Sequence, residues 1–164
     1  MNVKQMSVLA IFIALSVAGA FIKIPGVIGS VALDSFPSLL AACLIGPVAG
    51  AVVGGLGHLI SAIIGGMLLG PLHFIIMLEM ALLAWTFGIL YRRDKRVGAA
   101  LLFFIGNACI SPLPFIFIIS WSFFVALIPS LAIATAINLG VALILLPRLT
   151  PILQKMIMNK GTKE

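Results

Sequence analysis

Long apolar runs dominate this chain, and short segments with polar residues, glycine or proline separate them. The first run extends from about residue 5 to residue 22 and is followed by a loop over residues 23–35 that contains Gly and Pro. Small residues at Ala18-Gly19-Ala20 also resemble a signal-peptidase site, so a cleaved signal is the alternative interpretation. The length of the run, and small residues along all of it, favour a membrane helix.

The second apolar stretch predicts two helices of unequal length. Gly46-Pro47 interrupts it, and proline is preferred in the first turn of a helix but cannot continue one. The first helix, 36–46, is too short to cross a hydrocarbon core of about 30 Å at a rise of about 1.5 Å per residue. It therefore either lies obliquely or follows a loop that dips into the bilayer. The second helix covers residues 47–66.

Three further helices are expected over residues 72–91, 97–117 and 124–146. A basic segment ends the first of them, and Pro147 with a basic tail over residues 148–164 follows the last. The prediction is a single domain, residues 1–164, of the all-α class: an integral membrane bundle of six transmembrane helices.

Composition supports this prediction, because 63% of the residues are apolar and only 9% are charged. A soluble domain carries about 45–50% apolar and about 25% charged residues. Six helices of about 20 residues use about 120 residues, which leaves no room for an attached soluble enzyme domain. The chain is therefore expected in the bacterial cell membrane as a multi-pass protein.

The net charge of +6 indicates orientation in the membrane and does not point to nucleic-acid binding. Basic residues of membrane proteins collect on the cytoplasmic side. With both termini and the connection over residues 92–96 in the cytoplasm, nine of the ten basic residues lie inside and only Lys23 lies outside. The sequence thus predicts that both termini are cytoplasmic.

Glu79 and His58 are the most informative polar residues, because ionisable groups at membrane depth are costly and are usually functional. Each lies about 12 Å below the outer end of its helix at about 1.5 Å per residue, so the two are expected to face one another across a cavity. A structural Glu–His pair is the alternative. His73 is six residues from Glu79 and does not share its helix face, which argues against a metal site. The chain contains no recognisable catalytic motif.

The other polar residues allow more than one role. Asp34 either caps the following helix with Ser35 or contacts a ligand. Asn107 and Ser111 are spaced i, i+4 and share a face, whereas Thr135 and Asn138 are expected to join helices. Trp121 is either an anchor at the membrane interface or a stacking surface.

Small residues repeat at intervals of four in two helices. Gly46, Gly50 and Gly54 form a ridge that His58 continues, so His58 is expected to point into the bundle. Ala10, Ala14 and Ala18 form a similar stripe, which either packs internally or is offered to another protein. In the outer half of the bundle, two carboxylates and two histidines face only one basic residue, which suits a neutral or weakly cationic ligand.

The whole chain resembles the substrate-binding S-components of energy-coupling factor (ECF) vitamin transporters. The resemblance lies in the size, the six-helix topology, the alanine repeat in AIFIALSVAGA, and the segments DSFPSLLAACLIGPVAGAVVGGLGHLISAIIGG and GPLHFIIMLEMALLAW. These two segments are similar to a subgroup that transports α-ribazole or a related cobalamin precursor.

The resemblance implies high-affinity binding of the vitamin in an outward-facing pocket, which the loop Ile24–Asp34 would close. The chain would dock on a membrane scaffold (T) protein with two ATPase subunits, which hydrolyse the ATP, and would itself bind no cofactor. Metal-transporting members present an N-terminal His, and this chain begins Met1-Asn2-Val3, which argues against nickel or cobalt. Ala10, Ala14 and Ala18 would form the docking face. The implied pocket residues are Asp34, His58, His73, Glu79, Asn107 and Trp121.

Three alternatives stay open from the sequence. The ligand could be another neutral or weakly cationic vitamin, such as cobalamin or a thiamin-related compound. The chain could instead be an integral-membrane enzyme that uses Glu79 and His58 as acid and base, or a structural membrane protein without a ligand.

Overall fold

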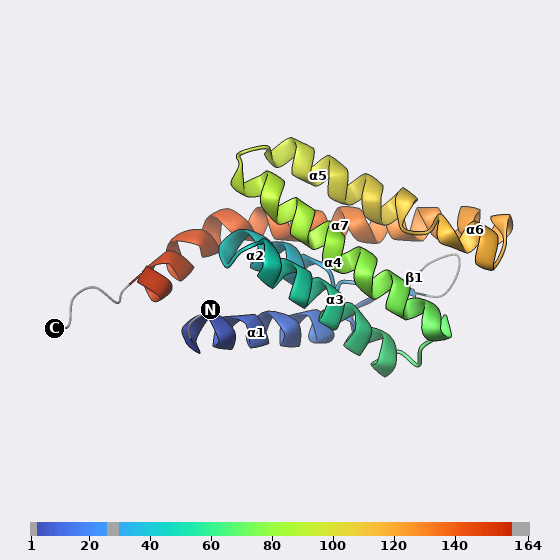
Figure 1. Cartoon of the computed structure of the whole chain (residues 1–164), viewed down its shortest axis with the longest axis horizontal. Coiled ribbons are helices and arrows are strands. Elements are labelled where there is room, and N and C mark those ends of the chain that lie inside the picture. Colours follow the sequence, from blue (N-terminus) through green and yellow to red (C-terminus); the bar gives the residue numbers. More distant parts are fainter. Residues whose placement is uncertain (1–2, 26–29, 159–164) are drawn as a thin grey trace.

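The computed structural model describes residues 3–25 and 30–158, in which nearly all of the regular structure is helical (Figure 1). A short antiparallel hairpin of β1 and β2, paired from Lys23↔Ala32 to Pro25↔Ser30, is the departure from the predicted all-α class. The elements are α1 (Val3–Gly19), β1 (Lys23–Pro25), β2 (Ser30–Ala32), α2 (Phe36–Leu44), α3 (Pro47–Ile64), η1 (Gly70–Leu72), α4 (His73–Arg92), α5 (Arg96–Ile105), η2 (Gly106–Ile110), α6 (Pro114–Ile118) and α7 (Trp121–Met158).

Four helical stretches in the described part are long and apolar enough to cross a membrane: Pro47–Ile64, Gly70–Arg92, Arg96–Ile118 and Trp121–Leu153. The helix α1 is apolar but shorter, and α2 has nine residues. Each of the six predicted helices is therefore present as a helical segment. The count of six membrane crossings and the side of the termini stay predictions.

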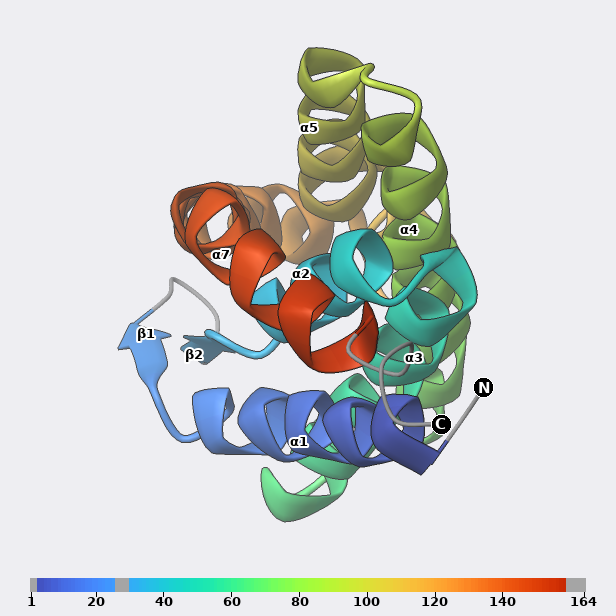
Figure 2. The same ribbon diagram turned by 90° about the vertical axis from the view of Figure 1, so that its left-hand side faces the viewer.

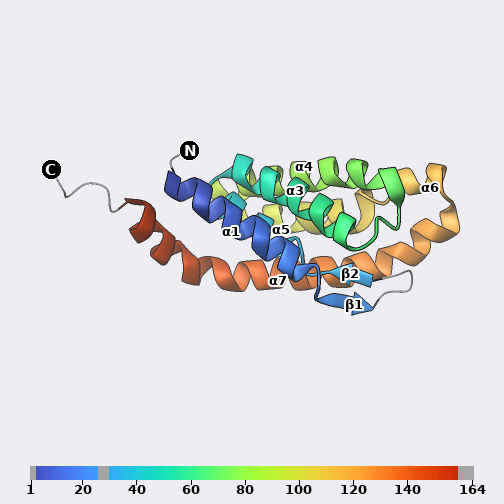
Figure 3. The same cartoon turned by 90° about the horizontal axis from the view of Figure 1, so that it is seen from below.

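The two ends of the bundle differ in what they carry (Figures 1 and 3). The start of α1, the connection between α4 and α5, and the end of α7 lie at one end, which we call the basic end because residues 92–96 are there. The hairpin, the connection between α3 and α4, and α6 lie at the opposite end, which we call the hairpin end.

The short helix α2 lies inside the bundle, among α1, α3, α4 and α7 (Figure 2). Residues 37–42 of this helix are all buried. The chain reaches its start from the hairpin through a segment that bonds to Asn138 of α7. The segment that precedes α2 thus packs into the bundle, and whether α2 lies obliquely or follows a loop that dips into the bilayer stays a prediction.

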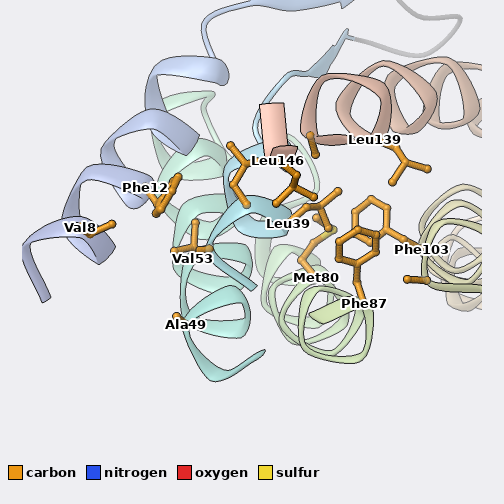
Figure 4. Packing of buried hydrophobic residues seen from close by; sticks show 14 of the residues in the cluster. Val8, Phe12, Leu39, Ala49, Val53, Met80, Phe87, Phe103, Leu139 and Leu146 are labelled. Atoms are coloured by element: carbon orange, nitrogen blue, oxygen red, sulfur yellow. The ribbon is translucent and has the colours of Figure 1, made fainter. Parts of the chain in front are cut away.

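Buried side chains from α2, α3, α4 and α5 meet in the hydrophobic core (Figure 4). Leu39, Val53, Phe87 and Phe103 are fully buried, and the rings of Phe87 and Phe103 pack edge to face with centroids 5.9 Å apart. Edge-to-face packing of aromatic rings adds to the stabilisation that burial of their surface gives.

Glycines bring the helix backbones together in this region, as the spacing of four predicted. A Cβ at Gly54 would lie 2.9 Å from the backbone oxygen of Met80, and one at Gly50 would lie 2.8 Å from Cα of Ala42. Contacts that close exclude any larger residue unless a helix moves. Small residues therefore set the spacing between α3 and its neighbours α2 and α4.

The last helix is longer than the predicted 124–146. It begins at Trp121 and continues to Met158 with Pro129, Pro147 and Pro151 inside it, so residues 148–158 of the predicted tail are helical. A proline removes one backbone hydrogen bond and bends a helix, but it does not have to end the helix. Leu153 is buried in the core cluster, and this packing holds the helix together beyond the prolines. Figure 3 shows the resulting bend of α7.

Candidate functional site

A cavity of about 320 Å³ opens at the hairpin end of the bundle. Its walls come from the end of α1, the segment before α2, the second half of α3, the first half of α4, the η2–α6 region and the first half of α7. Among its lining residues in the described part of the chain, none is Lys or Arg. The polar lining residues are Asp34, Ser35, His58, Ser61, His73, Glu79, Asn107, Ser111 and Asn138.

One wall carries Glu79 on α4 and two polar residues on the facing segment. Ser111 lies within hydrogen-bonding reach of the Glu79 carboxylate, and the Asn107 amide donates to Oγ1 of Thr135 at 2.7 Å. The second carboxylate oxygen of Glu79, Oε2, is buried and has no hydrogen-bond partner in the described structure. A buried acceptor without a partner is unfavourable, so this oxygen is suited to accept a donor from a ligand.

Asn107 and Ser111 both face the cavity from the π-helical turn η2 and its end. The amide of Ser111 donates to the carbonyl of Gly106, five residues earlier, at 2.7 Å. Such a turn is wider than an α-helical turn, and residues four apart become more nearly aligned along the helix. Gly106 lets the Leu83 side chain of α4 pack against this turn, since a Cβ at this position would collide with that side chain. Sequence spacing predicted the shared face, which residues four apart also have in an α-helix, but it did not predict the π turn.

The mouth of the cavity carries a chain of polar contacts that joins three elements. The Leu69 amide donates to Nε2 of His73 at 3.4 Å, and Nδ1 of His73 lies 3.2 Å from Nε2 of His58. Nδ1 of His58 lies 3.9 Å from Oδ2 of Asp34, which also accepts the Ser61 hydroxyl at 3.3 Å. The side chains of Asp34 and His58 are only 17% and 18% exposed. The connection between α3 and α4 is thus linked to the hairpin across the mouth.

Burial raises the pKa of Asp34 from 3.8 to about 6, although hydrogen bonds from its surroundings, including that of Ser61, lower it. Burial disfavours the charged form of a carboxyl group, whereas hydrogen bonds to the carboxylate favour it. Asp34 is therefore mostly ionised at neutral pH, at the mouth of a cavity without a fixed positive charge in its described lining.

Asn138 closes the inner side of the cavity and holds the start of α2. Its Oδ1 accepts the amides of Ser35 and Phe36 at 3.1 and 2.9 Å, and its Nδ2 donates to the carbonyls of Ala32 and Ala134. This corrects the expectation that Asp34 and Ser35 cap α2, because Ser35 makes no side-chain capping bond. Joining of helices by Asn138 and by Thr135, which accepts from Asn107, is confirmed.

Five of the six predicted pocket residues line this one cavity, namely Asp34, His58, His73, Glu79 and Asn107. Trp121 is outside the lining: it begins α7, is 63% exposed and packs against Phe124. Ser61, Ser111 and Asn138 also line the cavity, although they are not among the predicted pocket residues. The available signal was that each lies about one helical turn, three or four residues, from His58, Asn107 or Thr135. Substrate contact by any of these residues stays a prediction.

Glu79 and His58 line the same cavity but have different partners. His58 contacts His73 and Asp34, whereas Glu79 contacts Ser111. The structure thus offers no support for a structural Glu–His pair or for a joint acid–base site. Within the described ranges, no group of three or more His, Cys, Asp or Glu residues is arranged to hold a metal ion.

The alanine stripe of α1 points away from the bundle. Ala10, Ala14 and Ala18 are exposed, whereas Val8 and Phe12 on the opposite face are buried. Of the two sequence-based alternatives, the structure favours a surface open to a partner over an internal seam. The predicted lid, residues 24–34, is only partly described, because residues 26–29 lie outside the described residues.

Comparison with known proteins gives one match. A family model described as "ECF transporter, substrate-specific component" matches residues 4–160, which is nearly the whole chain. No curated protein and no solved structure matches the chain.

Proposed function

We propose that this chain, which belongs to the family of ECF transporter substrate-specific components, binds α-ribazole or a related cobalamin precursor in the cavity at the hairpin end. Members of this family are transport subunits rather than enzymes, and their substrates are of the vitamin type. The identity of the ligand is the part of the proposal that goes beyond the family.

The buried, unpartnered Oε2 of Glu79 is the observation that carries the proposal. An acceptor of this kind favours a ligand that brings a hydrogen-bond donor to it. Two carboxylates and the absence of Lys and Arg from the described lining disfavour a phosphorylated or carboxylated ligand. A nucleoside such as α-ribazole has hydroxyl donors and no phosphate, and therefore meets both conditions.

The apolar part of the lining supports a flat ring system. Met80, Phe115, Phe123, Leu127 and Leu131 contribute apolar surface next to the polar wall. Sites for small molecules commonly combine apolar walls with a few convergent polar groups. The aromatic base of α-ribazole would lie against this surface, and its ribose would reach the polar groups.

Orientation and partners follow from the two ends of the bundle. We place the basic end in the cytoplasm with both termini, according to the distribution of Lys and Arg, so that the cavity opens outward. The family implies docking with a membrane T protein and ATPases. We assign the exposed stripe of Ala10, Ala14 and Ala18 to this contact, because small residues allow close approach of another helix.

The test is calorimetric titration of the purified protein in lipid nanodiscs with α-ribazole and, separately, with α-ribazole 5′-phosphate. We expect saturable binding of the nucleoside and binding of the phosphate at least about tenfold weaker, because the described lining contains two carboxylates and no Lys or Arg. Glu79→Gln should weaken nucleoside binding about tenfold, the size of one hydrogen bond to a charged group.

Asp94→Asn is the matched control, since Asp94 is an exposed carboxylate at the basic end. This variant should bind like the wild type. Absence of saturable nucleoside binding by the wild type would refute the proposed ligand. Cobalamin and thiamin, titrated in the same way, test the alternative vitamins.

A further inference from the structure

In the polar contacts at the cavity mouth, the known donor and acceptor at the two ends determine which ring nitrogens carry a proton. We call the chain of Leu69 amide, His73, His58 and Asp34 the histidine relay. A backbone amide can only donate, so Nε2 of His73 has to accept and carries no proton. In a neutral imidazole the proton is then on Nδ1, which donates to Nε2 of His58.

The same reasoning applies to the second ring. Because Nε2 of His58 accepts, its proton is on Nδ1, which faces Oδ2 of Asp34 at 3.9 Å. The reverse arrangement would place the Nε2 proton of His73 against the Leu69 amide and a bare Nδ1 of His58 against the carboxylate. A doubly protonated His58 would also require a proton on Nε2 of His73, against the same amide. The Leu69 amide at one end and the Asp34 carboxylate at the other therefore require the same arrangement, in which both rings carry their proton on Nδ1.

We infer that His58 and His73 do not offer a nitrogen to the substrate, but act as positioning residues that orient and polarise Asp34 for it. All four ring nitrogens already face a partner within the relay. The Asp34 carboxylate accepts Ser61 on Oδ2 and lines the cavity. Asp34 is thus the group of the relay that contacts the ligand, and it does so at the mouth of the cavity. Glu79 contacts the ligand at a second level, because it lies six residues beyond His73 on α4, which is about 9 Å along the helix.

This inference rests on the proposed function and makes it more specific. Two acceptors at separate levels of one cavity select a ligand with hydrogen-bond donors at two positions. The relay also connects the mouth to the segment between α3 and α4, because its first donor is the Leu69 amide in that segment. A ligand that contacts Asp34 would therefore influence this segment through the two rings.

The first test needs no ligand. Nitrogen NMR of the protein labelled with ¹⁵N-histidine, at neutral pH in nanodiscs, distinguishes protonated from bare ring nitrogens. His58 and His73 are the two histidines of the chain, so assignment needs only one substitution. We expect both rings to carry the proton on Nδ1. A proton on Nε2 of either ring, or rapid exchange between the two forms, would overturn the relay.

The second test compares two substitutions of His58. The amide nitrogen of Asn can occupy the place of Nδ1 and still donate toward Asp34, whereas the amide of Gln lies at the place of Nε2 and cannot. The readout is the midpoint of the Asp34 titration, followed by the ¹³C shift of its carboxyl carbon. His58→Gln should raise this midpoint by about 0.5 pH unit, because the Nδ1–H dipole that faces Oδ2 of Asp34 at 3.9 Å is lost, and His58→Asn should leave it within about 0.2.

The groups that face Asp34 are few, which makes this readout specific. They are His58 and Ser61 from α3, His73 of α4 acting through His58, and Glu79 on the same cavity, while Ser16 of α1 donates to the Asp34 backbone carbonyl. Equal midpoints in the two variants would show that His58 only fills space, and would overturn the inference. Failure of α-ribazole to bind would instead refute the proposed ligand and leave both NMR results unaffected.

Discussion

The two halves of α3 show how one helix can serve opposite purposes. In the first half, Gly50 and Gly54 bring the helix within contact of the α2 and α4 backbones. In the second half, His58 and Ser61 face a cavity, and their partners are polar side chains. The same pair of helices is thus closed by small residues at one end and kept hollow by polar ones at the other. Whether α3 packs tightly or lines a cavity therefore depends on which residues occupy that part of the helix.

Asn138 lies at the boundary between these two regions, and its loss should have the largest effect. Asn138→Ala removes four hydrogen bonds and leaves the amides of Ser35 and Phe36 without partners in a buried place. We expect a loss of about 4 kcal/mol in the free energy of unfolding, measured by denaturant titration in detergent micelles. Asn138→Asp, measured at a pH low enough to protonate the carboxyl group, keeps the acceptor and one donor and should lose about half as much. Equal losses would mean that the amides of α2 do not depend on this oxygen.

The hollow end should be sensitive to pH through Asp34. Because its pKa is 3.8 when unfolded and about 6 when folded, the folded protein holds the proton more tightly. Stability therefore falls as the pH rises from about 4 to about 6, by on the order of 2 kcal/mol, and stays lower above this range. Thermal unfolding of the wild type and of Asp34→Asn across this range isolates the effect. A difference between the two proteins that does not change with pH would contradict this prediction.

The packed end should be sensitive to a single methyl group. Gly50→Ala places a Cβ 2.8 Å from Cα of Ala42 and should destabilise the protein by about 2 kcal/mol. The control is Gly140→Ala in α7, where no atom lies within 4 Å of the new Cβ and alanine is the better helix former. This control should be neutral or stabilising by up to about 1 kcal/mol. Similar effects of both changes in thermal unfolding would argue against close packing at Gly50.

The exposed stripe of α1 should have the smallest effect on the fold. Ala14→Leu adds side chain to a surface that no described element covers, so the free energy of unfolding should change by less than about 0.5 kcal/mol. Assembly with the T protein and ATPases should be lost, as measured by co-purification from membranes. The control Val17→Leu, next to the buried face, should retain assembly. If Ala14→Leu unfolds the protein instead, the stripe is part of the packing.

Much of the architecture could be predicted from the sequence, because apolar runs and their interruptions follow directly from the bilayer as solvent. The break at Gly46-Pro47 separates α2 from α3 as expected. The end of α7 could not be predicted in this way, since Pro147 usually ends a helix and only the burial of Leu153 shows why this one continues.

The candidate site shows a similar division. The cost of polar groups at membrane depth identified Glu79, His58 and Asn107 without any structure, and all three line the cavity. Their partners could not be deduced, because they depend on how helices rotate and on how deep loops lie. His73 meets His58 only because of the turn that precedes α4, and Trp121 is on the outside because α7 begins there.

The π turn at residues 106–110 holds one residue more than an α-helical turn, because its hydrogen bonds join residues five apart instead of four. The wider turn absorbs the extra residue, so the helical segments on its two sides keep nearly the orientation that an unbroken α-helix would give them. Deleting one residue there would restore the α-helix and remove or reposition a side chain of the cavity wall without turning the rest of the bundle. Gain or loss of a single codon in this turn is therefore a change that the fold tolerates and that substitution counts do not record.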